Sequence, residues 1–145
     1  MIKTIRFIGD NEELLSVAFF IRTQVFVNEQ GVPVSIDCDN YDIIANHYLI
    51  LEDAKPIATA RWRKTENGIK LERFAVLKEY RTKNIGSTIL KEVLFDVTIF
   101  GEPVYLHVQL MAVGFYEKYG FVKEGSEFKE AGISHYKMIY SGNPL

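Results

Sequence analysis

One stretch of the sequence combines residue types and spacing that could bind an anion. From Leu71 to Ser87, an apolar, strand-like segment leads through the basic residues Arg81 and Lys83 into a helix start with small side chains. The first backbone N–H groups of a helix lack partners and lie at the positive end of its dipole, so they can bind phosphate. Asn84 and Gly86 suit this turn because they permit unusual backbone angles and a close approach of the anion. The stretch therefore predicts a phosphate-binding turn.

Other chemistries are excluded by residues that the sequence lacks. The acidic segment 37–42 lacks the glycine of a calcium loop, and the twelfth position of such a loop would be Tyr48 instead of Glu. The same acids disfavour the thiolate of Cys38, which makes it a poor nucleophile. The chain has no His-Glu-x-x-His, Cys-x-x-Cys or Gly-x-x-x-x-Gly-Lys motif. We therefore expect neither a metal site nor nucleotide hydrolysis.

Hydrophobic periodicity predicts the elements that must position this turn. Strands are expected at 3–8, 47–51, 57–63, 69–77, 104–108, 121–128 and 134–140, and helices at 11–26, 85–100 and 111–119. The three strands between 47 and 77 follow one another through short turns and should pair antiparallel. Segment 28–46 is irregular and longer than most connections, which favours a functional loop or one with a short helix. This order predicts an α/β fold of mixed α+β type, with a mixed, largely antiparallel sheet and helices on both faces.

Length and composition indicate one domain spanning residues 1–145. The chain is 48% hydrophobic and 25% charged, with a net charge of -2 and a single cysteine. One thiol cannot form an internal disulfide, which suggests a reducing compartment. No uninterrupted apolar run is long enough for a membrane helix, and the N-terminus lacks the apolar region of a signal peptide. We therefore expect a cytoplasmic protein that binds neither membrane nor nucleic acid.

The net charge hides an asymmetry along the chain. Residues 11–53 carry eight acids and one base, whereas residues 55–91 carry ten bases and three acids. One interpretation is a set of solvated faces that cancel. The other is a bipolar molecule with an anion site in its middle third and a cation-tolerant surface in its first third.

Several short motifs together resemble the GNAT acetyltransferase superfamily. Arg81 to Gly86 is similar to that family's pyrophosphate turn, and Ala112 to Phe121 to its later Ala-x-x-Phe-Tyr-x-Lys-x-Gly-Phe helix. Residues 22–33 and 128–135 look like signatures of the small bacterial ElaA-like branch. Asn84 stands where the family usually has the first glycine of the turn, but Asn tolerates left-handed geometry. We expect the turn to keep its shape, with cofactor affinity weakened rather than lost.

The resemblance implies acetyl-CoA as the cosubstrate. In this family the strand before the turn binds the pantetheine arm and the turn binds the pyrophosphate. One backbone N–H, of Ala75 or Val76, would polarise the thioester carbonyl. The cofactor-binding residues implied are Phe74, Ala75, Val76, Arg81, Thr82, Lys83, Asn84, Ile85, Gly86, Ser87 and Phe115.

The resemblance also implies direct transfer of an acetyl group to an amine. Tyr116 occupies the position of the general acid, because a phenol can protonate the departing thiolate. Glu72 is one strand period before Phe74, is expected on the same face, and is predicted to accept the proton of the amine through water. The alternative bases are Glu29, His47, His107 and His135.

The acceptor is expected between the first helix, its following loop and the C-terminal strands. The residues predicted to bind it are Arg22, Phe26, Glu29, Gln30 and His135. The predicted function is an acetyl-CoA-dependent N-acetyltransferase that acts on a primary amine of a small molecule or peptide, as a monomer or homodimer. A non-catalytic acyl-CoA-binding sensor is the alternative, and an interaction domain without a cofactor is the third.

Overall fold

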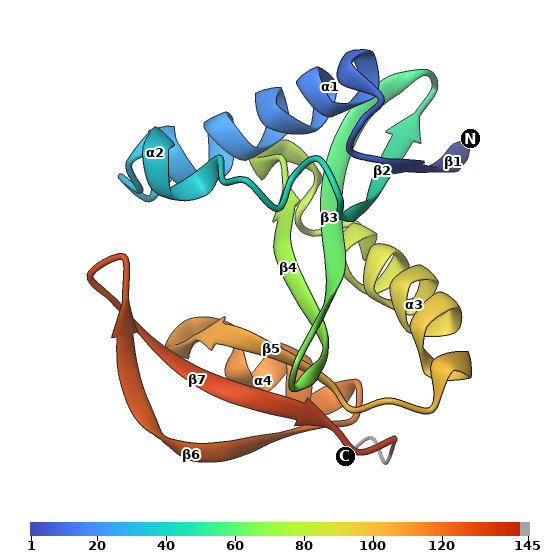
Figure 1. Ribbon diagram of the computed structural model, residues 1–145. Helices are drawn as coiled ribbons and strands as arrows, with labels where there is room; N and C mark the ends of the chain where they lie inside the picture. Colours follow the sequence, from blue (N-terminus) through green and yellow to red (C-terminus); the bar gives the residue numbers. More distant parts are fainter. Residues whose placement is uncertain (143–145) are drawn as a thin grey trace.

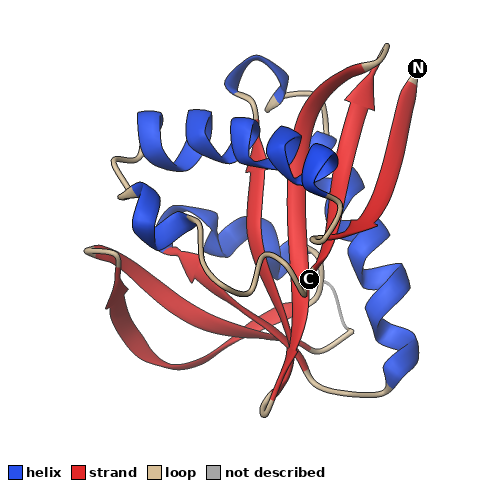
Figure 2. Cartoon of the chain, turned by 45° about the horizontal axis from the view of Figure 1, so that its top comes forward, coloured by secondary structure: helices blue, strands red, loops and turns tan. Residues whose placement is uncertain are grey.

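A computed structural model describes residues 1–142 (Figure 1). Its sheet has seven strands in the order β1-β2-β3-β4-β5-β7-β6, and only the β4–β5 pair is parallel. The strands are β1 (Ile2–Ile8), β2 (Asn46–Glu52), β3 (Lys55–Thr65), β4 (Gly68–Val76), β5 (Val104–Gln109), β6 (Phe121–Glu130) and β7 (Ile133–Tyr140). The helices are α1 (Glu12–Arg22), α2 (Val34–Asp37), α3 (Ile85–Val97) and α4 (Val113–Lys118). Helices lie on both faces of the sheet, which confirms the predicted fold class (Figure 2).

The first helix begins after Asn11, which caps it. The side chain of Asn11 accepts a hydrogen bond from the backbone N–H of Leu14 at 3.1 Å. Beyond Arg22 the chain continues as a π-helical segment, η1 (Thr23–Glu29), so helical structure extends past the predicted end near residue 26. The short helix α2 then lies within the long segment 28–46, as one of the two predictions for that segment required.

The parallel pairing of β4 with β5 is short. It joins Ile69–Leu71 to Val104–Leu106 only, and beyond Leu71 the two strands diverge (Figure 1). A bulge in β4 accompanies the divergence, because Arg73 has a positive φ of 59° and the register with β3 shifts there. The sheet is therefore open between the second half of β4 and the end of β5.

The bulge corrects the prediction that Glu72 and Phe74 share a face. One extra residue in a strand reverses the side-chain alternation that follows it. Phe74 consequently packs with the core under α3 and α4, whereas Glu72 contacts Arg61 on the opposite face. Both side chains still reach the opening between the strands.

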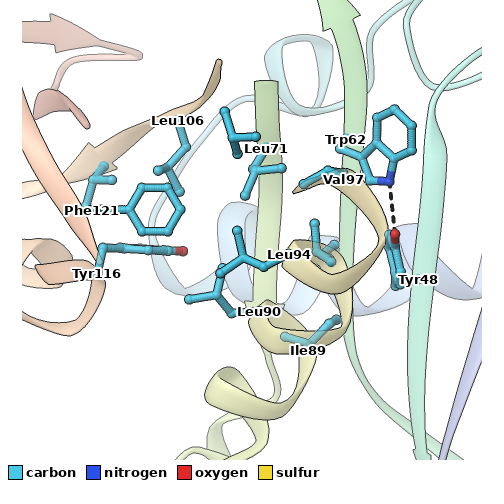
Figure 3. Close-up of a cluster of buried hydrophobic side chains, with 14 of the residues drawn as sticks. Tyr48, Trp62, Leu71, Ile89, Leu90, Leu94, Val97, Leu106, Tyr116 and Phe121 are labelled. Atoms are coloured by element: carbon cyan, nitrogen blue, oxygen red, sulfur yellow. Dashed lines mark hydrogen bonds between the residues drawn. The ribbon is translucent and has the colours of Figure 1, made fainter. Parts of the chain in front are cut away.

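Two apolar clusters hold the sheet in this shape. The larger one lies between the sheet and helices α3 and α4, and Figure 3 shows Leu90, Leu71 and Phe121 within it. The smaller one packs α1 against the first strands and the end of β4. At the edge of the larger cluster, the indole of Trp62 donates a hydrogen bond to the Tyr48 hydroxyl at 2.9 Å. The face of β5 and β7 opposite α4 carries the polar side chains His107, Gln109 and His135.

Within residues 1–142, no helix is long and apolar enough to cross a membrane. The same residues contain no group of three or more His, Cys, Asp or Glu side chains arranged to hold a metal ion. Burial raises the pKa of the Cys38 thiol, and this agrees with the prediction that it is a poor nucleophile.

Candidate functional site

A cavity of about 480 Å³ opens where β4 and β5 diverge. Its walls come from both strands, from η1 and α2 on one side, and from α4 and the β6–β7 hairpin on the other. A volume of this size is typical of small-molecule sites. Of the residues singled out in the sequence, those that line it are Phe26, Gln30, Glu72, Phe74, His107, Tyr116 and His135.

The basic turn lies at the start of α3, and none of its residues lines the cavity. Asn84 adopts the left-handed conformation, with φ 60° and ψ 22°, as its tolerance of that geometry predicts. The hydroxyls of Ser87 and Thr88 both donate to the Asn84 carbonyl at 2.9 Å, which fixes the turn. Within the described chain, the backbone N–H groups of residues 84–87 have no hydrogen-bond partner. They are therefore available to an anion.

Neither the backbone angle at Gly86 nor the contact beside it requires a glycine. A Cβ at this position would lie 3.6 Å from the ring of Phe115, an ordinary van der Waals contact. Phe115 thus packs beside the first turn of α3. The expected positive φ belongs to Asn84 and not to Gly86.

Arg81, in the turn, forms hydrogen bonds with both β4 and η1. Its Nε donates to the Val76 carbonyl at 2.9 Å, and its Nη2 pairs with Glu29 of η1 at 2.8 Å. The Lys83 ammonium lies 5.1 Å from the ring centre of Tyr80. Glu29 partly neutralises Arg81, whereas Lys83 has no carboxylate partner among the described residues. Of the two cations beside the turn, Lys83 therefore has the more available charge.

The backbone of β4 offers a donor toward the gap between the strands. The N–H of Leu77, just after β4, donates to the Ile57 carbonyl of β3 at 2.9 Å. Because successive N–H groups along a strand point to opposite sides, every second residue of β4 directs its N–H away from β3. Val76 is one of these, and its carbonyl indeed turns outward to Arg81. Of the two N–H groups predicted to polarise a carbonyl, this geometry favours that of Val76 over that of Ala75.

Tyr116 lies at the junction of the larger apolar cluster and the cavity. Figure 3 shows its ring beside Phe121 with the hydroxyl directed away from α4, and the ring of Phe74 meets it edge-on at 6.3 Å. Burial raises the pKa of Tyr116, so the phenol stays protonated at any working pH. Among residues 1–142 its hydroxyl has no hydrogen-bond partner, which leaves the proton free for a ligand.

Glu72 is held by three cations. It accepts hydrogen bonds from Nε of Arg61 at 3.1 Å and Nε of Arg63 at 2.8 Å, and Lys70 Nζ lies 3.3 Å away. Burial alone would raise its pKa, but the Arg63 hydrogen bond and the charges of Arg61 and Lys70 lower it. The carboxylate is therefore ionised but a weak base.

Arg22 does not reach the cavity. Its guanidinium is 1% exposed and pairs with Asp37 at 3.2 Å and Asp42 at 2.7 Å. Arg61, from the basic third of the sequence, binds the same Asp42 at 2.7 Å and also Asp39. Much of the charge asymmetry along the chain is thus cancelled inside the protein. The acidic first third is less a surface for a cationic ligand than the internal partner of the basic strands.

The three histidines occupy different places. His47 is buried, stacks on Phe7 and contacts the Asp42 carbonyl through Nε2, and it does not line the cavity. His107 and His135 both line the cavity and flank Glu130. His107 Nδ1 lies 3.0 Å from one oxygen of Glu130, and His135 Nε2 lies 3.7 Å from the other.

Several cavity residues received no role in the sequence analysis. They are Arg63, Lys70, Arg73, Asp37, Asp39, Gln109 and Glu130. Strand periodicity could have indicated Lys70, because it is two residues before Glu72 and thus on its face. Glu130 could not be found in this way, because the reach of a hairpin across the sheet depends on its tertiary position.

Comparisons with known proteins agree with this geometry. Residues 24–141 match the family model described as an acetyltransferase (GNAT) domain. The chain is 37% identical to the uncharacterized N-acetyltransferase YjcF of Bacillus subtilis over 91% of this chain and 96% of that protein. The crystal structure of Escherichia coli ElaA superposes with a TM-score of 0.86 at 25% identity, covering 97% and 100% of the two chains.

A third similarity concerns the fold alone. The PaiA N-acetyltransferase of Thermoplasma acidophilum, solved in complex with coenzyme A, has a TM-score of 0.70 at 17% identity, covering 97% of this chain and 99% of that one. These findings confirm the family expected from the sequence motifs. The sheet is open between β4 and β5, and the family model covers most of the chain. The chain therefore belongs to the GNAT family of acetyltransferases, whose members use acyl-CoA.

Proposed function

We propose that the protein is an acetyl-CoA-dependent N-acetyltransferase that modifies a primary amine of a small molecule or peptide in a ternary complex. The opening between β4 and β5 carries this proposal. Along the chain, the second half of β4 connects this opening to the turn before α3, whose N–H groups are unpaired among the described residues, and the cavity in the opening is lined by both polar and apolar side chains. Two substrates can therefore meet in the opening without sharing a binding surface.

The acetyl-CoA side consists of the turn and the second half of β4. The N–H groups of residues 84–87 would bind the pyrophosphate, with Lys83 adding positive charge. The outward-facing backbone of Phe74 and Val76 would bind the pantetheine arm. The PaiA structure contains coenzyme A in the same fold, which supports this assignment.

Transfer requires little from side chains. The neutral amine attacks the thioester carbonyl and forms the new C–N bond, while the N–H of Val76 stabilises the oxygen that becomes negative. The C–S bond then breaks and the thiolate of CoA departs. Tyr116 donates its proton to the departing sulfur. The free phenolic hydroxyl at the cavity wall supports this role.

The proton of the amine goes to water and then to Glu72, as predicted from the sequence. The ionised state of Glu72 supports this role, and its lowered pKa limits the driving force. To test this role, kcat of the Glu72→Gln variant is measured with an amine acceptor of known basicity. We expect kcat to fall if Glu72 accepts the proton.

Arg22 and Glu29 act on the acceptor through other residues. Arg22 holds Asp37 at the cavity wall, and Glu29 holds Arg81 beside β4. Phe26, Gln30 and His135 line the cavity and are placed to contact the acceptor. Gln30 is fixed by a 2.8 Å hydrogen bond from Gln109 of β5.

Calorimetric titration with acetyl-CoA, followed by an amine panel read out as free thiol, tests the proposal. Saturable binding and amine-dependent thiol release are expected. Absence of binding at millimolar acetyl-CoA would contradict the proposal altogether. Binding without thiol release across a broad panel would instead support a sensor that has lost turnover.

A further inference from the structure

The floor of the cavity includes polar side chains on the face of the sheet opposite α3 and α4. Arg63 of β3 pairs with Lys70 of β4 in register, and Lys70 pairs with Tyr105 of β5. His107 follows Tyr105 by two residues and so shares its face, and His135 of β7 pairs with Gln109 two residues further along β5. Most of the permanent positive charge is on β3 and β4, whereas the histidines are on β5 and β7. The two ends of the cavity floor therefore differ in charge.

The β3–β4 end has more cations than carboxylates. Five cations share four carboxylates in one connected network. Its members are the cations Arg22, Arg61, Arg63, Lys70 and Arg73 and the carboxylates Asp37, Asp39, Asp42 and Glu72. Burial and the neighbouring charge of Arg61 lower the pKa of Arg73, as expected where positive charge is in excess.

The surplus positive charge is available to a ligand. Within the described residues, Nη1 of Arg63 and Nη1 of Arg73 donate no hydrogen bond, and Lys70 Nζ contacts only Glu72. All three side chains line the cavity. Partly buried guanidinium and ammonium groups with spare N–H donors are suited to a carboxylate.

The β6–β7 end has a carboxylate, Glu130, that is 46% exposed. Among residues 1–142 its ion-pair partners are His107 and His135, and neither is a permanent cation. The His107 hydrogen bond lowers the pKa of Glu130, and the charge of Lys70 contributes from further away. Glu130 is therefore ionised and faces the cavity.

His135 complements Glu130 as an acceptor of N–H hydrogen bonds. Its Nδ1 donates to the Ile133 carbonyl at 2.7 Å, so in the neutral ring Nε2 carries the lone pair. That nitrogen lies 3.7 Å from the Glu130 carboxylate. A primary amine that enters between them would find two acceptors side by side.

We propose that the acceptor is an amino carboxylate, whose amine binds between Glu130 and His135 and whose carboxylate binds Lys70, Arg63 and Arg73. This inference rests on the proposed N-acetyltransferase activity and names its substrate class. A simple alkylamine would leave the cationic end without a partner. A carboxylate without an amine would leave Glu130 without one.

Matched pairs of amines test the inference in the wild-type protein. We would compare β-alanine with propylamine and γ-aminobutyrate with butylamine, at fixed acetyl-CoA, by free-thiol release. The members of each pair have closely similar amine basicity and length. We expect kcat/KM to be about 10- to 100-fold higher for the amino carboxylate of at least one pair, the range supplied by one charge-assisted hydrogen bond.

Two variants separate the two ends of the cavity. Lys70→Met keeps the length of the side chain and should bring the ratio within a pair toward one. Glu130→Gln should instead lower kcat/KM for both members of a pair and keep their ratio. Lys64→Met is the matched control, because Lys64 is 56% exposed, pairs with Glu102 outside the cavity, and should preserve the ratio.

Acetyl-CoA binding, measured by calorimetry in each variant, keeps the outcomes distinguishable. If the wild-type protein does not bind acetyl-CoA, the proposed function itself is contradicted. Intact binding with equal rates within both pairs, or faster rates for the alkylamines, would overturn the amino-carboxylate inference alone. If neither pair is acetylated, saturation-transfer NMR with the same four compounds decides, and equal binding within both pairs would also overturn it.

Discussion

Glu72→Gln gives the sharpest test of how the cavity wall is built. The substitution is isosteric but removes the one negative charge that Arg61, Arg63 and Lys70 share. Breaking a buried ion pair by removing one partner costs about 3–5 kcal/mol, because the remaining charge stays buried and uncompensated. Arg61 keeps Asp39 and Asp42, so among the described residues Arg63 and Lys70 are the cations that lose their carboxylate partner. Since the Gln side chain keeps one carbonyl oxygen as an acceptor, we expect a loss at the lower end, about 3 kcal/mol.

Urea unfolding at pH 7 measures this loss directly, and a melting temperature lowered by about 6–12 °C should accompany it. Glu124→Gln is the matched control. Glu124 pairs with Lys137 at 3.1 Å but is 54% exposed, so its loss should cost less than about 1 kcal/mol.

The pH dependence of the difference identifies its cause. The folded-state pKa of Glu72 is lowered, so its contribution to stability is present above the unfolded value, near 4.5, and disappears as the pH falls through the folded value. The gap between wild type and Glu72→Gln should therefore narrow as unfolding is repeated from pH 7 down to pH 3. A loss below about 1 kcal/mol at pH 7, or a gap that does not change with pH, would refute the reasoning.

Three further predictions follow from single contacts. Tyr116→Phe should lower kcat by about 100-fold or more under chemistry-limited conditions and leave acetyl-CoA affinity nearly unchanged, and an unaltered kcat would contradict the acid role. Asn84→Ala should cost about 1–2 kcal/mol in urea unfolding because of the positive φ, whereas Asn84→Gly should be nearly neutral. Gly9→Ala should cost at least about 2 kcal/mol, because the new Cβ would collide with the Asp42 carbonyl. Gly114→Ala, whose Cβ would meet nothing within 4 Å, is its control, and equal effects at the two glycines would contradict the packing argument.

The sequence predicted those features that depend on local preferences. The left-handed turn at Asn84 and the three antiparallel strands both follow from residues close to one another along the chain. Tyr116 was placed at the site by its motif, and it does line the cavity. In each case the interaction that decides the structure is between near neighbours.

Features that depend on long-range contacts were missed or misplaced. Arg22 was expected to face the acceptor but is buried against Asp37 and Asp42, because helix α1 turns that side chain inward. Glu72 was expected on the face of Phe74, but the bulge at Arg73 reverses the alternation. A bulge is stabilised by the neighbouring strand, so a count of residues along β4 cannot reveal it.

The sequence by itself determined the family, the order of the elements and the left-handed turn before α3, because periodicity, backbone preferences and short motifs act over a few residues. Only the tertiary structure decided which charges neutralise one another and which face the cavity. Asp39 and Arg61 are 22 residues apart, and His107 and Glu130 are 23 apart, yet each pair lies within 3.0 Å. Electrostatic interactions depend on distance in space and on burial, and neither can be read from positions along the chain.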